Sequence, residues 1–446
     1  MNEKVAMVSL GCPKNQVDAE AMLYRLRDAG YQIGVEESQA DVIIVNTCGF
    51  IEDAKKEAIE NILEAAALKK EGQLKALIVT GCLAERYRDE ITREIGEVDA
   101  VVGIGKNGEI ASVIRRVLDG KNGNVYGEKT ELDLNTPRIL GGYPFSTYLK
   151  IGDGCDNHCT YCAIPLIRGK MRSRKIEDCV AEAEHLAENG VRELVVVAQD
   201  TTAYGTDLYG RPMLSELLRR LCRIEKLHWI RTLYTYPDRI DEQLIQTVCE
   251  EEKLVPYFDI PMQHCDAAVL KRMNRRGNRK TLTELVQKLR QRIPGVTVRT
   301  TLITGFPGET EEQFCSLHEF VKEVRFDRLG CFAYSPEEDT PAASFPDQID
   351  EQVKQDRMER IMETQMRISA EKNEEKIGTV TEVLVEGYDD YIKCYFGRTP
   401  ADAPEVDGKI FFYATRPLSF GEYVRVKVND SIEYDLLGEM IDESAE

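Results

Sequence analysis

Apolar runs alternate with amphipathic helical patterns over the first 118 residues. The strand-like runs VAMVSLG, DVIIVNT, KALIVTG and DAVVGIG are followed by helical patterns at residues 16–29, 52–68, 85–95 and 108–118. This alternation is typical of a doubly wound parallel sheet, whose strands end at one common edge. We therefore expect an N-terminal α/β domain at residues 1–120 and a polar linker at 121–140.

A second alternating series begins after the linker. Strand-like runs lie at 147–151, 193–198, 229–234, 257–260, 297–303 and 328–333, and helical patterns separate them, for example at 176–188, 213–225 and 282–292. Six strand–helix units predict an incomplete, TIM-like (βα)6 barrel over residues 141–372. Such barrels place their chemistry at the carboxyl ends of the strands.

The last part of the chain has a different pattern. A charge-rich helical stretch at 350–376 leads to the runs TVTEVLVEG, YIKCYFGR, KIFFYAT and EYVRVKVND, which glycine, proline and aspartate separate. These runs predict a small all-β barrel of about five strands at residues 373–441. Such folds often bind nucleic acid. Residues 373–440, however, hold seven Lys or Arg against fourteen Asp or Glu, a net charge of −7 that makes nucleic-acid binding unlikely.

Composition narrows the class of protein. The 446 residues carry 78 Asp or Glu and 58 Lys or Arg, a net charge of −20, which repels nucleic acid and attracts basic partners. No long segment is uniformly apolar and the first residues do not resemble a signal peptide, so we expect a cytoplasmic protein without membrane contact. Thirteen cysteines in a reducing compartment indicate metal binding or redox work.

Three cysteines follow the first barrel strand in a C-x3-C-x2-C pattern, at Cys155, Cys159 and Cys162. Iron–sulfur clusters of the cubane type normally take four cysteine thiolates, so three leave one iron open for a non-protein ligand. The alternative is a structural zinc ion. Zinc requires a fourth ligand, and the nearest candidate, His158, is wedged between two of the cysteines.

Three further cysteines each follow a strand of the N-terminal domain: Cys12, Cys48 and Cys82. Because parallel strands end at one edge of the sheet, these cysteines are expected to converge and to hold a second cluster. The alternative is that each is a small buried hydrophobe. The other seven cysteines show no cluster spacing and are interpreted as packing residues.

Polar or glycine-rich segments follow several barrel strands. Gln199 and Gln263 are candidate ligand contacts, or simple hydrogen-bonding groups at strand ends. The segment 304–310, TGFPGET, contains Gly305 but lacks the G-K-[ST] of a phosphate-binding loop, so a nucleoside triphosphate is improbable. Four basic residues after the cysteines are either a solvated face or a clamp for a carboxylate, and we favour the clamp: Arg168, Lys170, Arg172 and Arg174.

The cysteine spacing, with Tyr161 just before the third cysteine, resembles that of radical S-adenosylmethionine enzymes, and 304–310 resembles their adenine-flanking loop. Together with the strand-end cysteines and the C-terminal barrel, called TRAM in that family, the whole chain resembles the methylthiotransferases. The opening VSLGCPKNQVDAE, the PMQHC segment and the acidic last domain resemble the RimO branch.

The resemblance implies methylthiolation of the β-carbon of an aspartate in protein twelve of the small ribosomal subunit. It implies two 4Fe–4S clusters, S-adenosylmethionine and a low-potential electron donor such as flavodoxin or ferredoxin. Tyr161, Gln199, Gln263 and Gly305 would contact the S-adenosylmethionine. Two alternatives stay open: a transfer-RNA adenosine methylthiotransferase, and a non-catalytic iron–sulfur carrier that would not cleave S-adenosylmethionine.

Overall fold

The computed structural model describes residues 3–49 and 51–441. Its first unit is a parallel sheet in the order β2-β1-β3-β4-β5. The strands are β1 (Lys4–Ser9), β2 (Gln32–Ile33), β3 (Val42–Thr47), β4 (Ala76–Gly81) and β5 (Ala100–Val102). The predicted doubly wound sheet is confirmed, and the short edge strand β2 is an addition to it.

Helices cover both faces of this sheet. One layer contains α1 (Pro13–Asp28) and α5 (Ile110–Leu118), and the other contains α2 (Glu52–Lys70), α3 (Cys82–Arg86) and α4 (Arg88–Glu94). Met22 and Ile110 pack in the first layer, whereas Ile62 and Ile91 pack in the second. The helix predicted at 85–95 is two helices, because Tyr87 leaves the helical conformation between them (φ −120°).

The central unit has six parallel strands in two neighbouring sheets, β10-β9-β6 and β11-β12-β13. The strands are β6 (Ser146–Lys150), β9 (Glu193–Val197), β10 (Trp229–Thr232), β11 (Tyr257–Gln263), β12 (Thr297–Thr304) and β13 (Arg328–Ala333). All six predicted strands are confirmed. Together the six strands form the curved wall of the barrel. Hydrogen-bonded pairing of the strands is interrupted between β10 and β11, where the described residues form a single isolated β-bridge, between Ile230 of β10 and Leu254 before β11.

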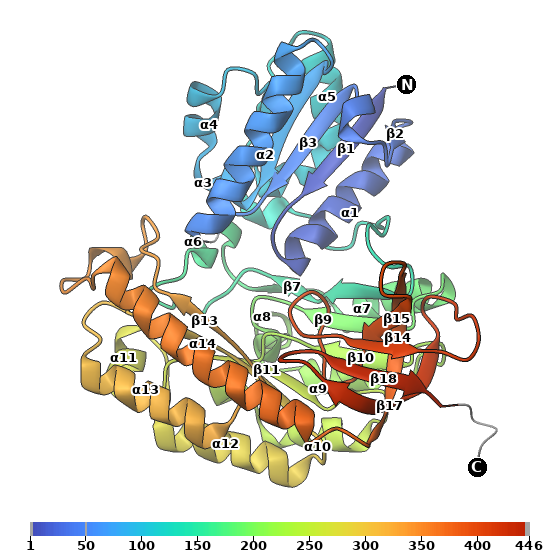
Figure 1. Ribbon diagram of the computed structural model, residues 1–446. Helices are drawn as coiled ribbons and strands as arrows, with labels where there is room; N and C mark the ends of the chain where they lie inside the picture. The colour runs from blue at the N-terminus through green and yellow to red at the C-terminus, as the bar shows by residue number, and fades with distance from the viewer. Residues whose placement is uncertain (1–2, 50, 442–446) are drawn as a thin grey trace.

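Helices cover the outside of this wall. They are α7 (Ile176–Glu188), α8 (Thr206–Tyr209), α9 (Leu214–Cys222), α10 (Glu242–Glu250), α11 (Ala267–Arg272), α12 (Arg279–Arg292), α13 (Glu311–Val324) and α14 (Glu351–Glu374). The short helix α6 (Ile164–Arg168) instead packs between the barrel and the N-terminal unit, where Ile167 packs with Cys82 and Ile104. A two-stranded hairpin, β7 (Gly152–Asp153) with β8 (Arg172–Ser173), brackets the cysteine segment. The charge-rich helix α14 runs along the wall and buries Ile361 and Ile368 in its core (Figure 1).

Short 3-10 turns complete the helical structure. They are η1 (Glu37–Gln39), η2 (Ile104–Glu109), η3 (Lys129–Glu131), η4 (Thr201–Ala203), η5 (Pro237–Arg239) and η6 (Pro341–Ser344). No helix among the described residues is both long and apolar enough to span a membrane.

The C-terminal unit is a closed five-stranded barrel in the order β14-β15-β16-β18-β17. Its strands are β14 (Val380–Asp389), β15 (Cys394–Arg398), β16 (Ile410–Tyr413), β17 (Tyr423–Ser431) and β18 (Leu436–Met440). The segment 399–409 between β15 and β16 packs on the inner face of the central wall. There Arg231 donates to the Pro400 carbonyl (2.8 Å) and Tyr257 to Asp407 (2.6 Å). The small barrel therefore covers part of the open side of the larger one.

Candidate functional site

The N-terminal cysteine set is Cys12, Cys48 and Cys82. Cys12 precedes α1, Cys48 directly follows β3 and Cys82 begins α3, so the three lie beyond the carboxyl ends of neighbouring strands. The loops that carry them are closely packed. A Cβ atom on Gly11 would lie 2.6 Å from Cβ of Cys48, so this position accepts only glycine. The role of these cysteines as cluster ligands stays a prediction.

The barrel cysteine loop is the segment 154–163, between β7 and α6. Gly154, at φ +79°, begins it where a Cβ atom would lie 2.1 Å from the Lys170 carbonyl oxygen. Cys159 is buried, and its Sγ atom lies 3.8 Å from the Tyr236 hydroxyl and 3.7 Å from Nη1 of Arg275. The same Arg275 nitrogen lies 3.4 Å from the Tyr161 hydroxyl. Sequence reasoning missed Arg275, because nothing in the local pattern RMNRRGN separates it from its basic neighbours.

The electrostatics differ within the N-terminal cysteine set as well as between the two sets: burial raises the pKa of Cys82 despite the nearby charge of Arg168. Burial raises the pKa of Cys155 to about 11 and also raises the pKa of Cys162. Burial opposes ionisation of Cys12 too, but the nearby charges of Lys14 and Arg168, with backbone N–H donors, outweigh it and lower the pKa of Cys12. In the barrel cysteine loop, formation of metal-binding thiolates must therefore be driven by the metal itself.

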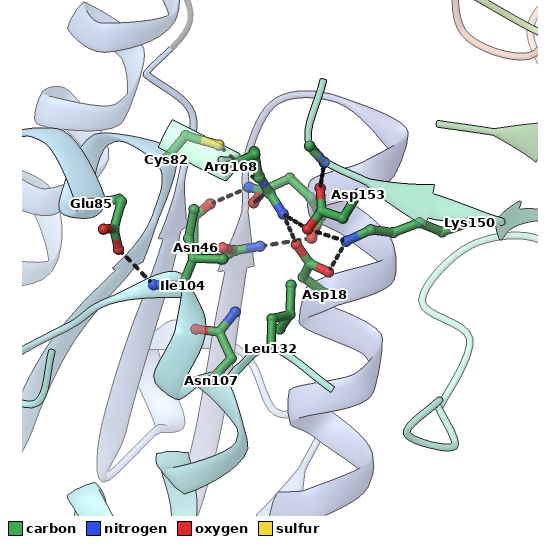
Figure 2. A network of polar contacts seen from close by, with 12 residues as sticks. Asp18, Asn46, Cys82, Glu85, Ile104, Asn107, Leu132, Lys150, Asp153 and Arg168 are labelled. Carbon is green, nitrogen blue, oxygen red and sulfur yellow. Dashed lines mark hydrogen bonds and ion pairs between the residues drawn. The ribbon is translucent and has the colours of Figure 1, made fainter. Parts of the chain in front are cut away.

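Arg168 connects the two regions (Figure 2). It is the last residue of α6, and its guanidinium group pairs with Asp18 of α1 and with Asp153 of β7 (3.2 Å). Its other terminal nitrogen, Nη2, lies 3.5 Å from Sγ of Cys82. Lys150 binds the same two carboxylates at 2.6 and 3.2 Å. The barrel cysteine loop is thus fixed to the N-terminal cysteine set through one buried ion-pair network.

This network corrects the interpretation of the basic residues after the cysteines. Arg168 and Arg174 are buried, and Arg174 pairs with Glu182 (2.5 Å) while also donating to the Lys150 carbonyl (3.0 Å). The hypothesis that they clamp a substrate or cofactor carboxylate is wrong, because carboxylates of the chain itself occupy both groups. The local sequence shows four cations but cannot show that Arg168 and Arg174 are buried, whereas Lys170 is exposed and Arg172 only partly buried.

The described residues hold no preformed site for a single metal ion. Among residues 3–49 and 51–441, no group of three or more His, Cys, Asp or Glu side chains converges to hold one metal ion, as a preformed zinc site would require. The cysteine ligands of a cubane bind different iron atoms and so need not meet at one point.

Gln199 offers a polar contact near the barrel cysteine loop. Its Nε2 donates to Asp153 (2.8 Å), whereas its Oε1 is buried without a hydrogen-bond partner. A buried acceptor without a partner is costly, so the position suits a ligand that donates a hydrogen bond.

The other two strand-end candidates have unusual backbones. Gln263, at φ 69°, ends β11 at an irregularity in its pairing with β12. Gly305 has φ +71°, and a Cβ atom there would lie 2.3 Å from the Lys354 side chain of α14. Its N–H donates to Glu309 (2.5 Å), which also accepts from buried His264 and from Arg357. Contacts of Gln263 and Gly305 with a cofactor stay predictions.

The N-terminal unit contacts the mouth of the barrel at two further points. Nζ of Lys14, in the first turn of α1, lies 3.5 Å from the ring centroid of Tyr234, which follows β10. Arg86 of α3 pairs with buried Glu337, in the segment after β13 (2.8 Å). Cys12 and Cys82 are next to these contacts in the chain, so the N-terminal cysteine set faces the carboxyl edge of the barrel.

Comparison with known families agrees with this architecture. Residues 4–103 match the Uncharacterized protein family UPF0004, residues 149–321 match the Radical SAM superfamily and residues 377–441 match the TRAM domain. Among solved structures, the radical S-adenosylmethionine methyltransferase TsrM from Kitasatospora setae is similar in fold, with a TM-score of 0.56, 14% identity and coverage of 87% of this chain and 82% of that one. The fold and the cysteine loop thus define a radical S-adenosylmethionine protein, a superfamily that uses this cofactor with a 4Fe–4S cluster.

Full-length relatives narrow the class. The chain is 49% identical to "Ribosomal protein uS12 methylthiotransferase RimO" of Desulforamulus reducens over 98% of this chain and 99% of that protein. It is 50% identical to the protein of the same name from Pelotomaculum thermopropionicum, over 99% of this chain and all of that protein. The relative in Clostridioides difficile is 49% identical, with the same coverage. The chain belongs to the RimO family of ribosomal protein uS12 methylthiotransferases.

Proposed function

We propose that this protein adds a methylthio group to the β-carbon of an aspartate in ribosomal protein uS12. Membership of the RimO family supports this reaction. One observation from the structure of this chain supports it as well. The 3.5 Å contact between Arg168 and Cys82 joins the helix after the barrel cysteine loop to the N-terminal cysteine set. A radical formed at one set and sulfur delivered from the other would therefore act on one substrate between them.

We assign one 4Fe–4S cluster to Cys155, Cys159 and Cys162 and a second to Cys12, Cys48 and Cys82. When bound, the first cluster and S-adenosylmethionine supply a 5′-deoxyadenosyl radical that can attack an unactivated C–H bond. The second cluster presents the sulfur that is attached, and a second S-adenosylmethionine supplies its methyl group. Tyr161, Gln199, Gln263 and Gly305 are assigned to the S-adenosylmethionine. The segment 399–409 and the first turn of α1 cover the barrel and limit access of water, which would otherwise compete for reactive species.

Charge supports a protein substrate. Ribosomal proteins are basic, and a chain of net charge −20 attracts them while it repels transfer RNA. We further propose domain boundaries at 1–120, 141–372 and 373–441 around a linker at 121–140. A cytoplasmic site of action, where ribosomal proteins are found, and a flavodoxin or ferredoxin as electron donor complete the proposal.

Anaerobic incubation tests the proposal. Protein with reconstituted clusters is mixed with S-adenosylmethionine, a low-potential reductant and uS12, and the uS12 is analysed by mass spectrometry. We expect a methylthio group on one aspartate. The Cys249→Ala variant, which alters an exposed cysteine outside both sets, is a matched control and should act like the unaltered protein. Methylthiolation of transfer RNA with uS12 unchanged would refute the proposal.

A further inference from the structure

Lys14 is an exception among the buried cations of this protein. Most buried lysine and arginine side chains pair with a carboxylate of the chain: Lys150, Arg168, Arg174, Arg231, Arg328, Lys354, Arg357 and Arg398. Within the described ranges, Lys14 and Arg275 have no such partner. Arg275 lies against Cys159, whereas Lys14 contacts the ring of Tyr234. An unpaired buried charge is unfavourable, so an anion is expected to join Lys14 when the protein acts.

The carboxylates near Lys14 bind other groups of the chain. Asp18, one helical turn further along α1, is held by Lys150 and Arg168. Asp259, at the barrel mouth, accepts from Arg299 (2.9 Å) and from the backbone N–H of Tyr234 (3.0 Å). Each nearby carboxylate is therefore already engaged. The Cys12 sulfur also attracts the ammonium group, but a cluster would take up that thiolate, which leaves the ammonium group for a ligand from outside.

Lys14 also lies at the junction between the N-terminal unit and the carboxyl edge of the barrel, where we expect the substrate to bind. It is two residues after Cys12, and its ammonium group lies against Tyr234 at the carboxyl edge of the barrel. Tyr234 is only partly buried and has a left-handed backbone (φ 60°), a strained conformation that its hydrogen bond to Asp259 helps to hold. Cys12 is close enough to Lys14 for the two charges to interact, and Cys159 contacts Tyr236, two residues after Tyr234.

We propose that Lys14 binds the side-chain carboxylate of the target aspartate of uS12. The inference rests on the proposed function and names its substrate contact. The carboxylate carbon is bonded directly to the β-carbon, so an ammonium group that holds the carboxylate also positions the carbon that reacts. The cation–π contact with Tyr234 orients Lys14 without neutralising its charge. Lys14 would thus favour aspartate over asparagine at the modified position.

The test is a double-mutant cycle that removes the charge of Lys14 from the enzyme and the charge of the target aspartate from uS12. The enzyme carries both clusters and S-adenosylmethionine. Dissociation constants are measured for uS12 and for uS12 with the target aspartate changed to asparagine. We expect the unaltered enzyme to bind the aspartate form about 30-fold more tightly, equivalent to about 2 kcal/mol. In Lys14→Met this ratio should fall to about 1, whereas Lys14→Arg should retain most of it. Lys56→Met, which removes an exposed cation of α2, is the control for net charge.

Iron content and cleavage of S-adenosylmethionine without uS12 are measured on every variant. If Lys14→Met retains both and still prefers the aspartate form by about 30-fold, the inference is wrong. If Lys14→Met loses iron, Lys14 acts by holding the cluster near Cys12, which also overturns it. If the unaltered enzyme leaves uS12 unmodified, the proposed function fails, a result distinct from either outcome.

Discussion

The N-terminal cysteine set takes one residue from each of three strand ends, whereas the barrel cysteine loop supplies three within residues 155–162. The first therefore depends on a complete sheet and on glycines such as Gly11 and Gly81 that let the loops approach one another. The second depends mainly on one segment, closed by the β7–β8 hairpin and by contacts with Arg275. Long-range folding forms the first site, and local chain geometry forms most of the second.

The charges around the two sites differ in the same way. Lys14, two residues along the chain, and Arg168, from the barrel, favour the Cys12 thiolate, whereas burial favours the protonated thiol at Cys155 and Cys162 and also at Cys82 of the N-terminal set. This contrast leads to four expectations, given from the largest effect to the smallest.

The largest effect should come from removing either set of cysteines. Replacing Cys12, Cys48 and Cys82 with alanine, or Cys155, Cys159 and Cys162, should each remove about half of the iron bound after reconstitution, because each set holds one cluster. Iron and sulfide analysis measures this. Loss of all iron in either triple variant would show that the two sites do not form independently.

A large loss of stability is expected from Arg168→Met. The change leaves Asp18 with Lys150, and Asp153 with Lys150 and the more distant Arg172 (3.8 Å), and breaking a buried ion pair costs about 3–5 kcal/mol. Thermal unfolding should show a lower Tm, and the cluster at the N-terminal set should be lost more easily than the other because Cys82 loses a contact. An unchanged Tm would exclude the network as a link between the two regions.

A smaller effect is expected where the C-terminal barrel is attached. Arg398 pairs with buried Glu193 (2.5 Å), and although burial opposes ionisation, this partner lowers the pKa of Glu193 from its ordinary value of 4.5 to about 2. The stabilisation is complete above about pH 4.5 and is lost as the pH falls towards 2, with a total on the order of 3 kcal/mol.

Acid unfolding of Arg398→Met checks this expectation. The variant should be less stable at neutral pH and should lose less further stability between pH 5 and about pH 3 than the unaltered protein. Arg416→Met, which removes the exposed pair with Glu422, is the matched control and should change stability by under about 1 kcal/mol. Equal acid sensitivity in the Arg398 variant and the unaltered protein would contradict the assignment.

The smallest effect should be on the rate of cluster assembly, with no change in final iron content. Between pH 7 and pH 9 the thiolate fraction of Cys155, with its pKa raised by burial to about 11, rises by about 100-fold, while Cys12 is already more ionised. Burial raises the pKa of Cys82 as well, so assembly should accelerate with rising pH at both sets, but more at the barrel cysteine loop, because the pKa of Cys12 is lowered. Each triple variant retains one cysteine set, so the change in its absorbance with time measures the rate of cluster assembly at that set. Equal acceleration of the two rates between pH 7 and pH 9 would contradict the difference in thiol pKa between the sets.

The sequence predicted those parts of the molecule that are specified locally. The strands were predicted from apolar runs, and the edge that gathers Cys12, Cys48 and Cys82 from the rule that parallel strands end together. The two-residue strand β2 was missed because it is too short to show a pattern. The break at Tyr87 was missed because residues 85–95 keep an unbroken helical pattern.

Contacts between distant segments could not be predicted. Arg275 reaches Cys159 across 116 residues, and Arg168 reaches Asp18 across 150. A single sequence gives no signal for such pairs, which is why Arg168 was interpreted as an open clamp and Lys14 was passed over. Both are basic residues beside a cysteine motif, and only tertiary packing shows that one is neutralised and the other is not.

The central claim is that the barrel cysteine loop forms the radical and that the N-terminal cysteine set is needed to attach sulfur. Measuring these two steps separately tests it most directly. Cys48→Ala and Cys249→Ala are each incubated anaerobically with S-adenosylmethionine, reductant and uS12, and both 5′-deoxyadenosine and methylthio-uS12 are quantified. We expect Cys249→Ala to form both products, and Cys48→Ala to form 5′-deoxyadenosine but no methylthio-uS12. Full methylthiolation by Cys48→Ala would contradict the account, since sulfur would then reach the substrate without the N-terminal cysteine set.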